Sequence, residues 1–132
     1  MGLFDMISSA IREGKERVAQ ETADFAERIR YARIKDACIM TARKLENASL
    51  PMKGSLSKLI QTKIQEEDNT NELFDAFNFM YNYAHDKRNT YALNISQWLG
   101  KRLDDLGDSR VEKKQRDDGR YVYVPDDYHR YY

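Results

Sequence analysis

The feature that most constrains this chain is a long run without glycine or proline, from Lys15 to Ala48. Within it, a stripe of mostly apolar residues is spaced by alternating steps of four and three residues, at Val18, Thr22, Phe25, Ile29, Ala32, Asp36 and Ile39. This spacing lies on one face of an α-helix and predicts a single long helix that packs against a neighbouring helix. The stripe weakens at Asp36, where a second row takes over on a shifted face, made of Ile34, Cys38, Thr41 and Leu45.

The predicted helix is too long for the rest of the chain to pack along all of it. A helix over residues 15–48 would measure about 50 Å at 1.5 Å per residue. In a chain of 132 residues no later helix is long enough to cover it alone. Either the helix breaks, or part of its stripe contacts another chain. In the second case Val18, Phe25 and Ile29 are the side chains expected to bind the partner, which includes a second copy of this chain.

Ahead of this run, residues 2–11 form an amphipathic segment. Its apolar side chains recur at helical spacing, at Leu3, Phe4, Ile7 and Ile11. The opening Met1-Gly-Leu-Phe-Asp5 resembles the start of phage-shock-type membrane-remodelling proteins and of short antimicrobial peptides, and this resemblance implies a membrane-binding helix. Three interpretations stay open: the segment caps the core of its own chain, it binds a protein, or its four apolar side chains dock on a membrane surface.

The first clear break signals are Pro51 and Gly54. Ser55 follows them and is a suitable N-cap, so a second helix is predicted from there through Ile64. The acidic residues 66–68 disfavour a helix C-terminus, and a loop is expected there.

Two more helices are predicted to form an antiparallel hairpin. Asn69, with Glu72 three residues later, resembles a capping box and begins a helix that runs to about His85. A polar turn over residues 86–89 leads into the last helix, which ends at the C-cap signal Gly107. Both helices are rich in aromatic and aliphatic residues, and their short connection favours antiparallel packing. This hairpin is the expected centre of the core.

The composition changes after Gly107, which divides the chain into a predicted helical domain, 1–107, and a charged linker with a tyrosine-rich tail, 108–132. Residues 108–119 are mostly charged and are expected to be mobile or a frayed helix. The tail contributes five of the nine tyrosines, at Tyr121, Tyr123, Tyr128, Tyr131 and Tyr132. Tyrosine offers a large contact area, so these residues are expected to bind a partner. Residues 121–124 favour a strand, which either joins a partner's sheet edge or lies across its own bundle.

Composition and motifs argue against several classes of function. Lys plus Arg and Asp plus Glu number 22 each, so the basic excess typical of nucleic-acid binders is missing. We find no phosphate-binding glycine loop, zinc spacing or calcium loop, and we expect no enzyme activity, cofactor or metal site. Cys38, the single cysteine, is expected to be a buried apolar side chain. No apolar run approaches the roughly 20 residues of a membrane span, and no signal peptide is recognised, which predicts a cytoplasmic location.

One basic cluster is the best candidate for contact with nucleic acid, formed by Arg28, Arg30, Arg33 and Lys35. Its members fall on different faces of the predicted helix, and Glu27 and Asp36 flank them. A solvated face with intrahelical ion pairs is therefore favoured over a binding patch.

Together these patterns predict an all-α fold of four or five helices, with one long N-terminal helix, an aromatic helical hairpin and an extended C-terminal tail. The expected function is a non-enzymatic protein–protein interaction module, such as an adaptor, a complex subunit or a small inhibitor, that binds through the long helix and the tail. The alternatives are a peripheral membrane protein that uses residues 2–11, and a nucleic-acid-binding subunit that uses the basic cluster.

Overall fold

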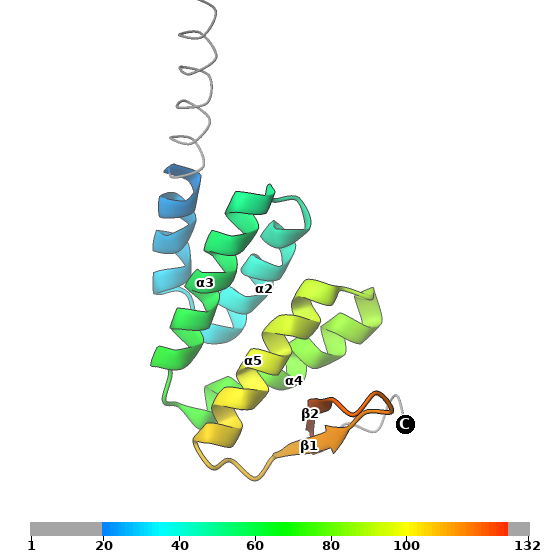
Figure 1. The fold of residues 1–132 in the computed structure, drawn as a ribbon. Helices are drawn as coiled ribbons and strands as arrows, with labels where there is room; N and C mark the ends of the chain where they lie inside the picture. The colour runs from blue at the N-terminus through cyan, green and yellow to red at the C-terminus, as the bar shows by residue number, and fades with distance from the viewer. Residues whose placement is uncertain (1–19, 127–132) are drawn as a thin grey trace, which may run out of the picture.

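The computed structural model describes residues 20–126 of this chain. Within them, the helical elements are residues 20–31, α2 (Ile34–Glu46), α3 (Leu50–Glu66), α4 (Thr70–Lys87) and α5 (Thr90–Asp105), followed by strands β1 (Val111–Gln115) and β2 (Tyr121–Pro125). Residues 20–31, α2 and α3 gather at one end of the molecule, and α4, α5 and the strands lie at the other (Figure 1). The broad prediction of a helical bundle is confirmed.

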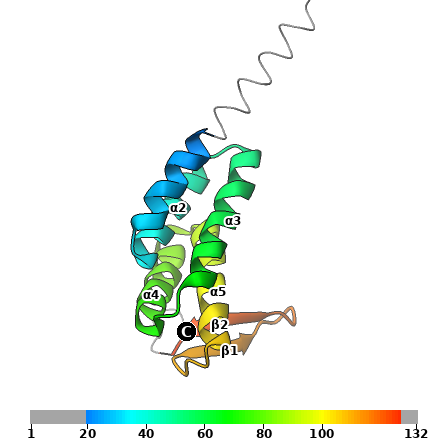
Figure 2. The ribbon, with the colours of Figure 1, turned by 90° about the vertical axis from the view of Figure 1, so that its left-hand side faces the viewer.

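The predicted long helix is broken. Helical residues 20–31 end just before Arg33, whose φ of −66° and ψ of 156° are extended, and α2 begins at Ile34. The chain reverses there, so that residues 20–31 and α2 lie side by side (Figure 2). The break falls where the apolar stripe shifts to its second face. Reversal brings Ile29 from the first row and Ile34 from the second into one core, which a straight helix could not do.

Helix α3 begins earlier than predicted. The expected N-cap, Ser55, lies inside the helix, which starts at Leu50 with Ser49 at its N-cap position. Pro51 occupies the first turn, where its missing N–H costs nothing because the first backbone donors of a helix have no partner within it. Proline therefore opens α3 rather than preceding it.

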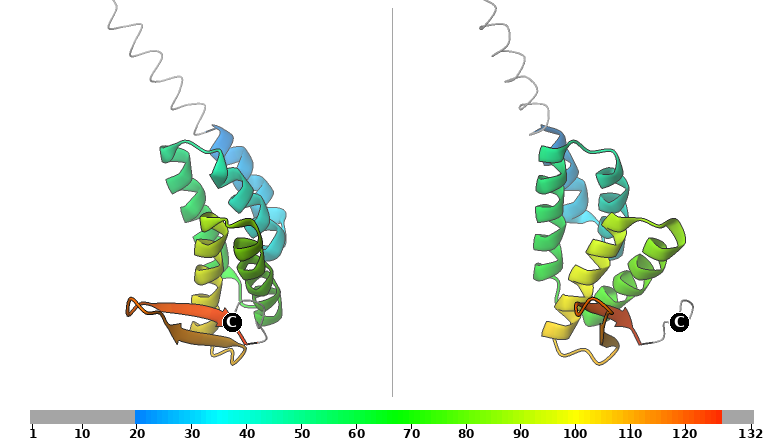
Figure 3. Two further views of the ribbon diagram at one scale, coloured as in Figure 1. Left: turned by 90° about the vertical axis from the view of Figure 1, so that its right-hand side faces the viewer. Right: turned by 45° about the vertical axis from the view of Figure 1, so that its right-hand side comes forward.

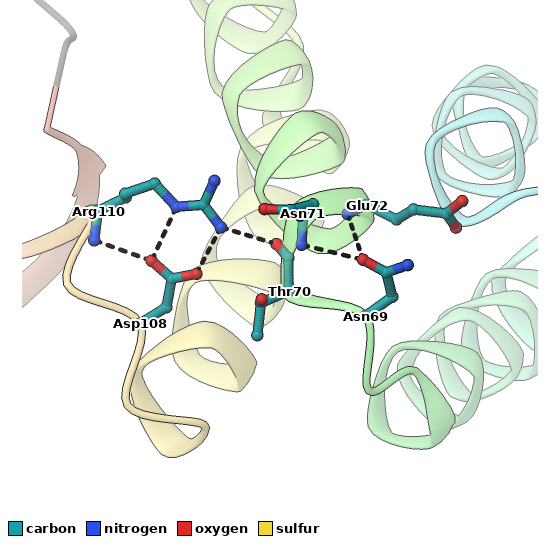
Figure 4. A network of polar contacts seen from close by, with 6 residues as sticks. All are labelled: Asn69, Thr70, Asn71, Glu72, Asp108 and Arg110. Carbon is teal, nitrogen blue, oxygen red and sulfur yellow. Dashed lines mark hydrogen bonds and ion pairs between the residues drawn. The ribbon is translucent and has the colours of Figure 1, made fainter.

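The aromatic hairpin is present as predicted. The Asn69 side chain accepts hydrogen bonds from the backbone N–H of Asn71 at 3.1 Å and of Glu72 at 3.2 Å, which caps α4 (Figure 4). At the other end of the hairpin, Asn89 caps α5 by accepting from the N–H of Ala92 at 3.0 Å. The facing sides of the two helices supply much of the buried core, including Leu73, Phe77, Met80, Ile95, Leu99 and Leu103.

The expectation for residues 108–119 is wrong. Instead of a mobile segment or a frayed helix, they contain strand β1, which pairs antiparallel with β2 in a two-stranded sheet. The strand predicted at residues 121–124 is confirmed, and its partner is the charged segment of its own chain. The predicted extended tail is thus folded up to Pro125, where it forms a β-hairpin that lies across the end of α5 (Figure 3).

A polar network fixes the base of this β-hairpin to the start of α4. The Arg110 guanidinium donates to both carboxylate oxygens of Asp108, at 3.0 and 2.7 Å, and to the backbone oxygen of Thr70 at 3.2 Å (Figure 4). The same guanidinium lies 4.4 Å from the ring centre of Phe74. Hydrogen bonds from Arg110 lower the pKa of Asp108, because they stabilise its charged form.

Candidate functional site

An apolar groove of about 500 Å³ runs between helical residues 20–31 and α3. Its apolar lining residues are Ala26, Ile29 and Leu59. The remaining lining consists of small hydroxyl residues and charged residues, namely Thr22, Arg30, Ser55, Lys58, Thr62, Lys63 and Glu66. We call this surface the apolar groove.

Local sequence explains why the apolar groove is open and why its walls behave as apolar surface. Small side chains line it from both helices, Thr22 and Ala26 from the first and Ser55 and Thr62 from α3. The hydroxyls of Ser55 and Thr62 donate to the backbone oxygens one turn earlier, Pro51 at 3.3 Å and Lys58 at 2.9 Å. With their polar atoms turned back to their own helix, these residues present carbon to the groove.

The rim of the apolar groove carries excess positive charge. The rim has three basic side chains, Arg30, Lys58 and Lys63, and one acidic side chain, Glu66. The Lys63 ammonium also donates to the backbone oxygen of Arg30 at 3.3 Å, which ties the end of the first described helix to α3. An apolar floor within a mainly basic rim favours a ligand with an apolar stripe and acidic flanks.

A second hollow, of about 580 Å³, lies on another side of helical residues 20–31, next to α2 and the start of α3. Three cations, Arg28, Arg43 and Lys44, line it together with Glu21, and Phe25 contributes to its wall. These four charged residues are all exposed, so the surface is well solvated. We call it the basic hollow.

The structure separates the four residues of the predicted basic cluster. Arg28 lines the basic hollow, whereas Arg30 lies on the rim of the apolar groove. Arg33 and Lys35 lie instead next to α4, where the Lys35 ammonium pairs with Asp75 at 3.5 Å. The four side chains therefore do not converge on one surface.

The residues expected to bind a partner through the long helix form the inner walls of the two hollows. Phe25 is only 6% exposed and lines the basic hollow, and Ile29 is 3% exposed and lines the apolar groove. Both belong to the core of their own chain. The other predicted residues lie outside the described part of the chain, namely Val18, Tyr128, Tyr131 and Tyr132 and the membrane candidates Leu3, Phe4, Ile7 and Ile11.

The two tyrosines of the described tail have different environments. Tyr121 is 57% exposed. Tyr123 packs on α5, where a Cβ built on Gly100 would lie only 2.5 Å from the Tyr123 Cβ. The Gln97 side chain holds the backbone of the same tyrosine: its oxygen accepts from the Tyr123 N–H at 2.7 Å, and its nitrogen donates to the Tyr123 oxygen at 3.0 Å.

The sequence allowed the strand at residues 121–124 to lie across its own bundle, as it does, but did not identify this docking site on α5. One signal was present, because a glycine inside a helix costs about 1 kcal/mol relative to alanine and often marks a close approach by another segment. Gly100 lies within α5 and fits that description. Nothing in the sequence pattern indicated that Gln97 would bond a backbone.

Cys38 and the possible metal ligands are the groups in residues 20–126 that bear on catalytic and metal chemistry. Cys38 is fully buried, as predicted, and burial raises the pKa of its thiol, which suits a core side chain and not a nucleophile. The described residues contain no group of three or more His, Cys, Asp and Glu side chains placed to hold a metal ion. In the same part of the chain, no helix combines the length and apolar character needed to cross a membrane.

Comparison with known proteins adds no assignment. No family model, no curated protein and no solved structure matches this chain. The apolar groove, the basic hollow and the β-hairpin are therefore the features from which a function is argued.

Proposed function

We propose that this chain is a non-enzymatic protein-interaction module, and that its apolar groove accepts an amphipathic helix with acidic flanks from another protein. The observation that carries the proposal is the groove itself: an apolar floor that includes Leu59, between two helices, under a mainly basic rim. The proposal retains binding through the first half of the predicted long helix, where Thr22 and Ile29 of the stripe line the groove, and adds the facing side of α3 to the contact.

Groove shape and chemistry favour a helical ligand. Two roughly aligned helices with small side chains between them leave a channel into which the apolar face of a third helix packs, a recurrent mode of peptide recognition. Each apolar anchor that becomes fully buried contributes about 1.5–3 kcal/mol. Acidic residues beside those anchors would meet Arg30, Lys58 and Lys63 on the rim, which sets orientation and speeds association.

The two alternative functions have less support. Nucleic-acid binding through the basic cluster would need its four side chains on one surface, and they lie on three. Membrane docking through residues 2–11 stays a prediction, because that segment lies outside the described residues.

A site-specific photo-crosslinking experiment tests the proposal. A benzophenone amino acid replaces Thr62, which is exposed and lines the groove, in the full chain added to an extract of cells that naturally make it. The control position is Asp104, which is also exposed and lies on α5 away from both hollows. We expect a crosslinked protein from position 62 alone, with the adduct on an amphipathic helix. Equal crosslinking from both positions would contradict the proposal.

Affinity measurements with the purified partner then use a matched pair of variants. Leu59→Glu places a charge in the groove, and Leu50→Glu makes the same change at a leucine that is 83% exposed and lines neither hollow. We expect Leu59→Glu to weaken binding by at least about tenfold, as the loss of one buried apolar anchor implies. Leu50→Glu should leave affinity unchanged. Circular dichroism confirms that both variants stay folded, and equal affinities would reject the groove as the binding surface.

A further inference from the structure

The two edges of the β-hairpin differ in how their backbone groups are used. In an antiparallel pair, alternate residues of each strand bond to the partner strand, and those between them point outwards. Tyr123 bonds to the Gln97 side chain, so its backbone points away from β1. Lys113 lies opposite Tyr123 in the register, and its N–H and C=O must therefore point away from β2.

The same alternation extends along the whole of β1. Just outside the strands, the Arg116 N–H donates to the Arg120 oxygen, and the Asp126 N–H donates to the Arg110 oxygen. Even-numbered residues thus face β2, and the backbones of Val111, Lys113 and Gln115 form the outer edge. Among residues 20–126, no side chain or other backbone segment bonds to these outward groups.

Of the two described strands, β1 is the one whose outer edge is open along its whole length. On the outer edge of β2, Gln97 occupies both backbone groups of Tyr123, and Pro125 has no N–H. In Figures 2 and 3, β1 lies on the side of the hairpin away from the helices. A strand with free donors and acceptors along one side is a template for pairing with another strand.

We propose that the outer edge of β1 pairs antiparallel with β1 of a second copy of this chain. The two-fold axis passes between the two Lys113 residues, so that the outward backbone groups of the two strands bond to each other. In this register Glu112 lies opposite Lys114 of the second copy, and Lys114 opposite its Glu112. Opposite charges directly across a strand pair are stabilising.

The charge pattern selects a second copy in preference to an unrelated strand. An acid and a base placed symmetrically about Lys113 are complementary to themselves under two-fold rotation, as an isologous interface requires. Within one chain the two side chains lie on the same face of the strand, with the Lys114 ammonium 3.6 Å from the Glu112 carboxylate. Pairing of two copies would set four charges of alternating sign side by side.

The central lysines do not oppose this arrangement strongly. Two like charges directly across a strand pair would repel. The Lys113 ammonium, however, lies 4.8 Å from the ring centre of Tyr121 and 6.0 Å from that of Tyr123, both on β2. The side chain is thus drawn across the hairpin, away from the open edge and from the second copy.

Sedimentation velocity of the full chain over a range of concentrations tests this proposal with two single charge reversals, Glu112→Lys and Lys114→Glu. Contact between two five-residue strands is small, so a concentration-dependent dimer is expected from the natural chain. Each reversal places like charges across both pairs and should weaken dimerisation about tenfold. An equimolar mixture of the two variants restores opposite charges at both pairs and should recover dimer.

Three results would overturn the proposal. One is a natural chain that stays monomeric up to millimolar concentration. Another is a dimer that neither reversal weakens, since this places the contact on a different surface. The third is a mixture that associates no better than the single variants. Glu112 is exposed and Lys114 is half-buried, so we expect both variants to keep the fold. Far-ultraviolet circular dichroism of each variant checks this.

Discussion

Replacement of Gly100 by alanine tests how tightly the β-hairpin is docked on α5. In an ordinary helix interior this change stabilises by about 1 kcal/mol, because alanine has the higher helix propensity. In this protein the added Cβ would meet the Tyr123 Cβ at 2.5 Å, its Cγ at 3.0 Å and the Phe77 Cε2 at 3.1 Å. The closest of these atoms is attached directly to the β2 backbone and cannot rotate away.

The size of the effect follows from the displacement that relieves this contact. Moving the Tyr123 Cβ from 2.5 Å to an ordinary contact of at least 3.4 Å shifts β2 by about 0.9 Å. The bond from Gln97 Nε2 to the Tyr123 oxygen, now 3.0 Å, would lengthen to roughly 3.9 Å and break. Loss of both Gln97 bonds costs about 2 kcal/mol, and overpacking without movement costs about 1–3 kcal/mol. After the propensity gain, we expect a net destabilisation of about 1–2 kcal/mol.

Urea and thermal unfolding measure this change, with Gly54→Ala as the matched control. Gly54 also lies within a helix, α3, and a Cβ there would have no neighbour within 4 Å. We expect the control to raise the midpoint temperature by about 2–4 °C and Gly100→Ala to lower it by about 3–8 °C. Faster hydrogen exchange at the Tyr123 amide should accompany the loss. If Gly100→Ala were as stable as the control, the close docking of β2 would be refuted.

Three further predictions concern single groups. Asn69→Ala removes the cap of α4 and should lower the free energy of unfolding by about 1 kcal/mol, as measured by urea denaturation. Burial raises the pKa of the Cys38 thiol, so above its ordinary value of 9.0 only the unfolded chain loses this proton, and stability should fall by up to about 1.4 kcal/mol per pH unit. Cys38→Ala should show a shallower slope there, and equal slopes would contradict the burial argument. Arg110 lowers the pKa of Asp108, so the charged Asp108 carboxylate stabilises the fold at pH values above the ordinary pKa of 3.8, and this stabilisation is lost as the pH falls through the lowered pKa. In Asp108→Asn the free energy of unfolding should therefore change less with pH in the acid range.

The local sequence determined the elements whose signals are confined to a few neighbouring residues. Asn69 with Glu72 predicted the cap of α4. Gly107, at a φ of +79°, follows the end of α5, as its C-cap signal indicated. The strand at residues 121–124 followed from its β-branched and aromatic residues. These features were predictable because their energetics depend on propensity and on backbone groups within one turn.

Tertiary structure alone decided where the chain reverses and what its charged segment does. No glycine or proline marks the break before Ile34; it forms because only a reversed chain buries both apolar rows in one core. Strand β1, five residues with three charges, has little β-propensity, and it forms because β2 is already fixed on α5 and supplies the ladder. The apolar groove likewise depends on the spacing of two helices, a distance that no pattern in the sequence encodes.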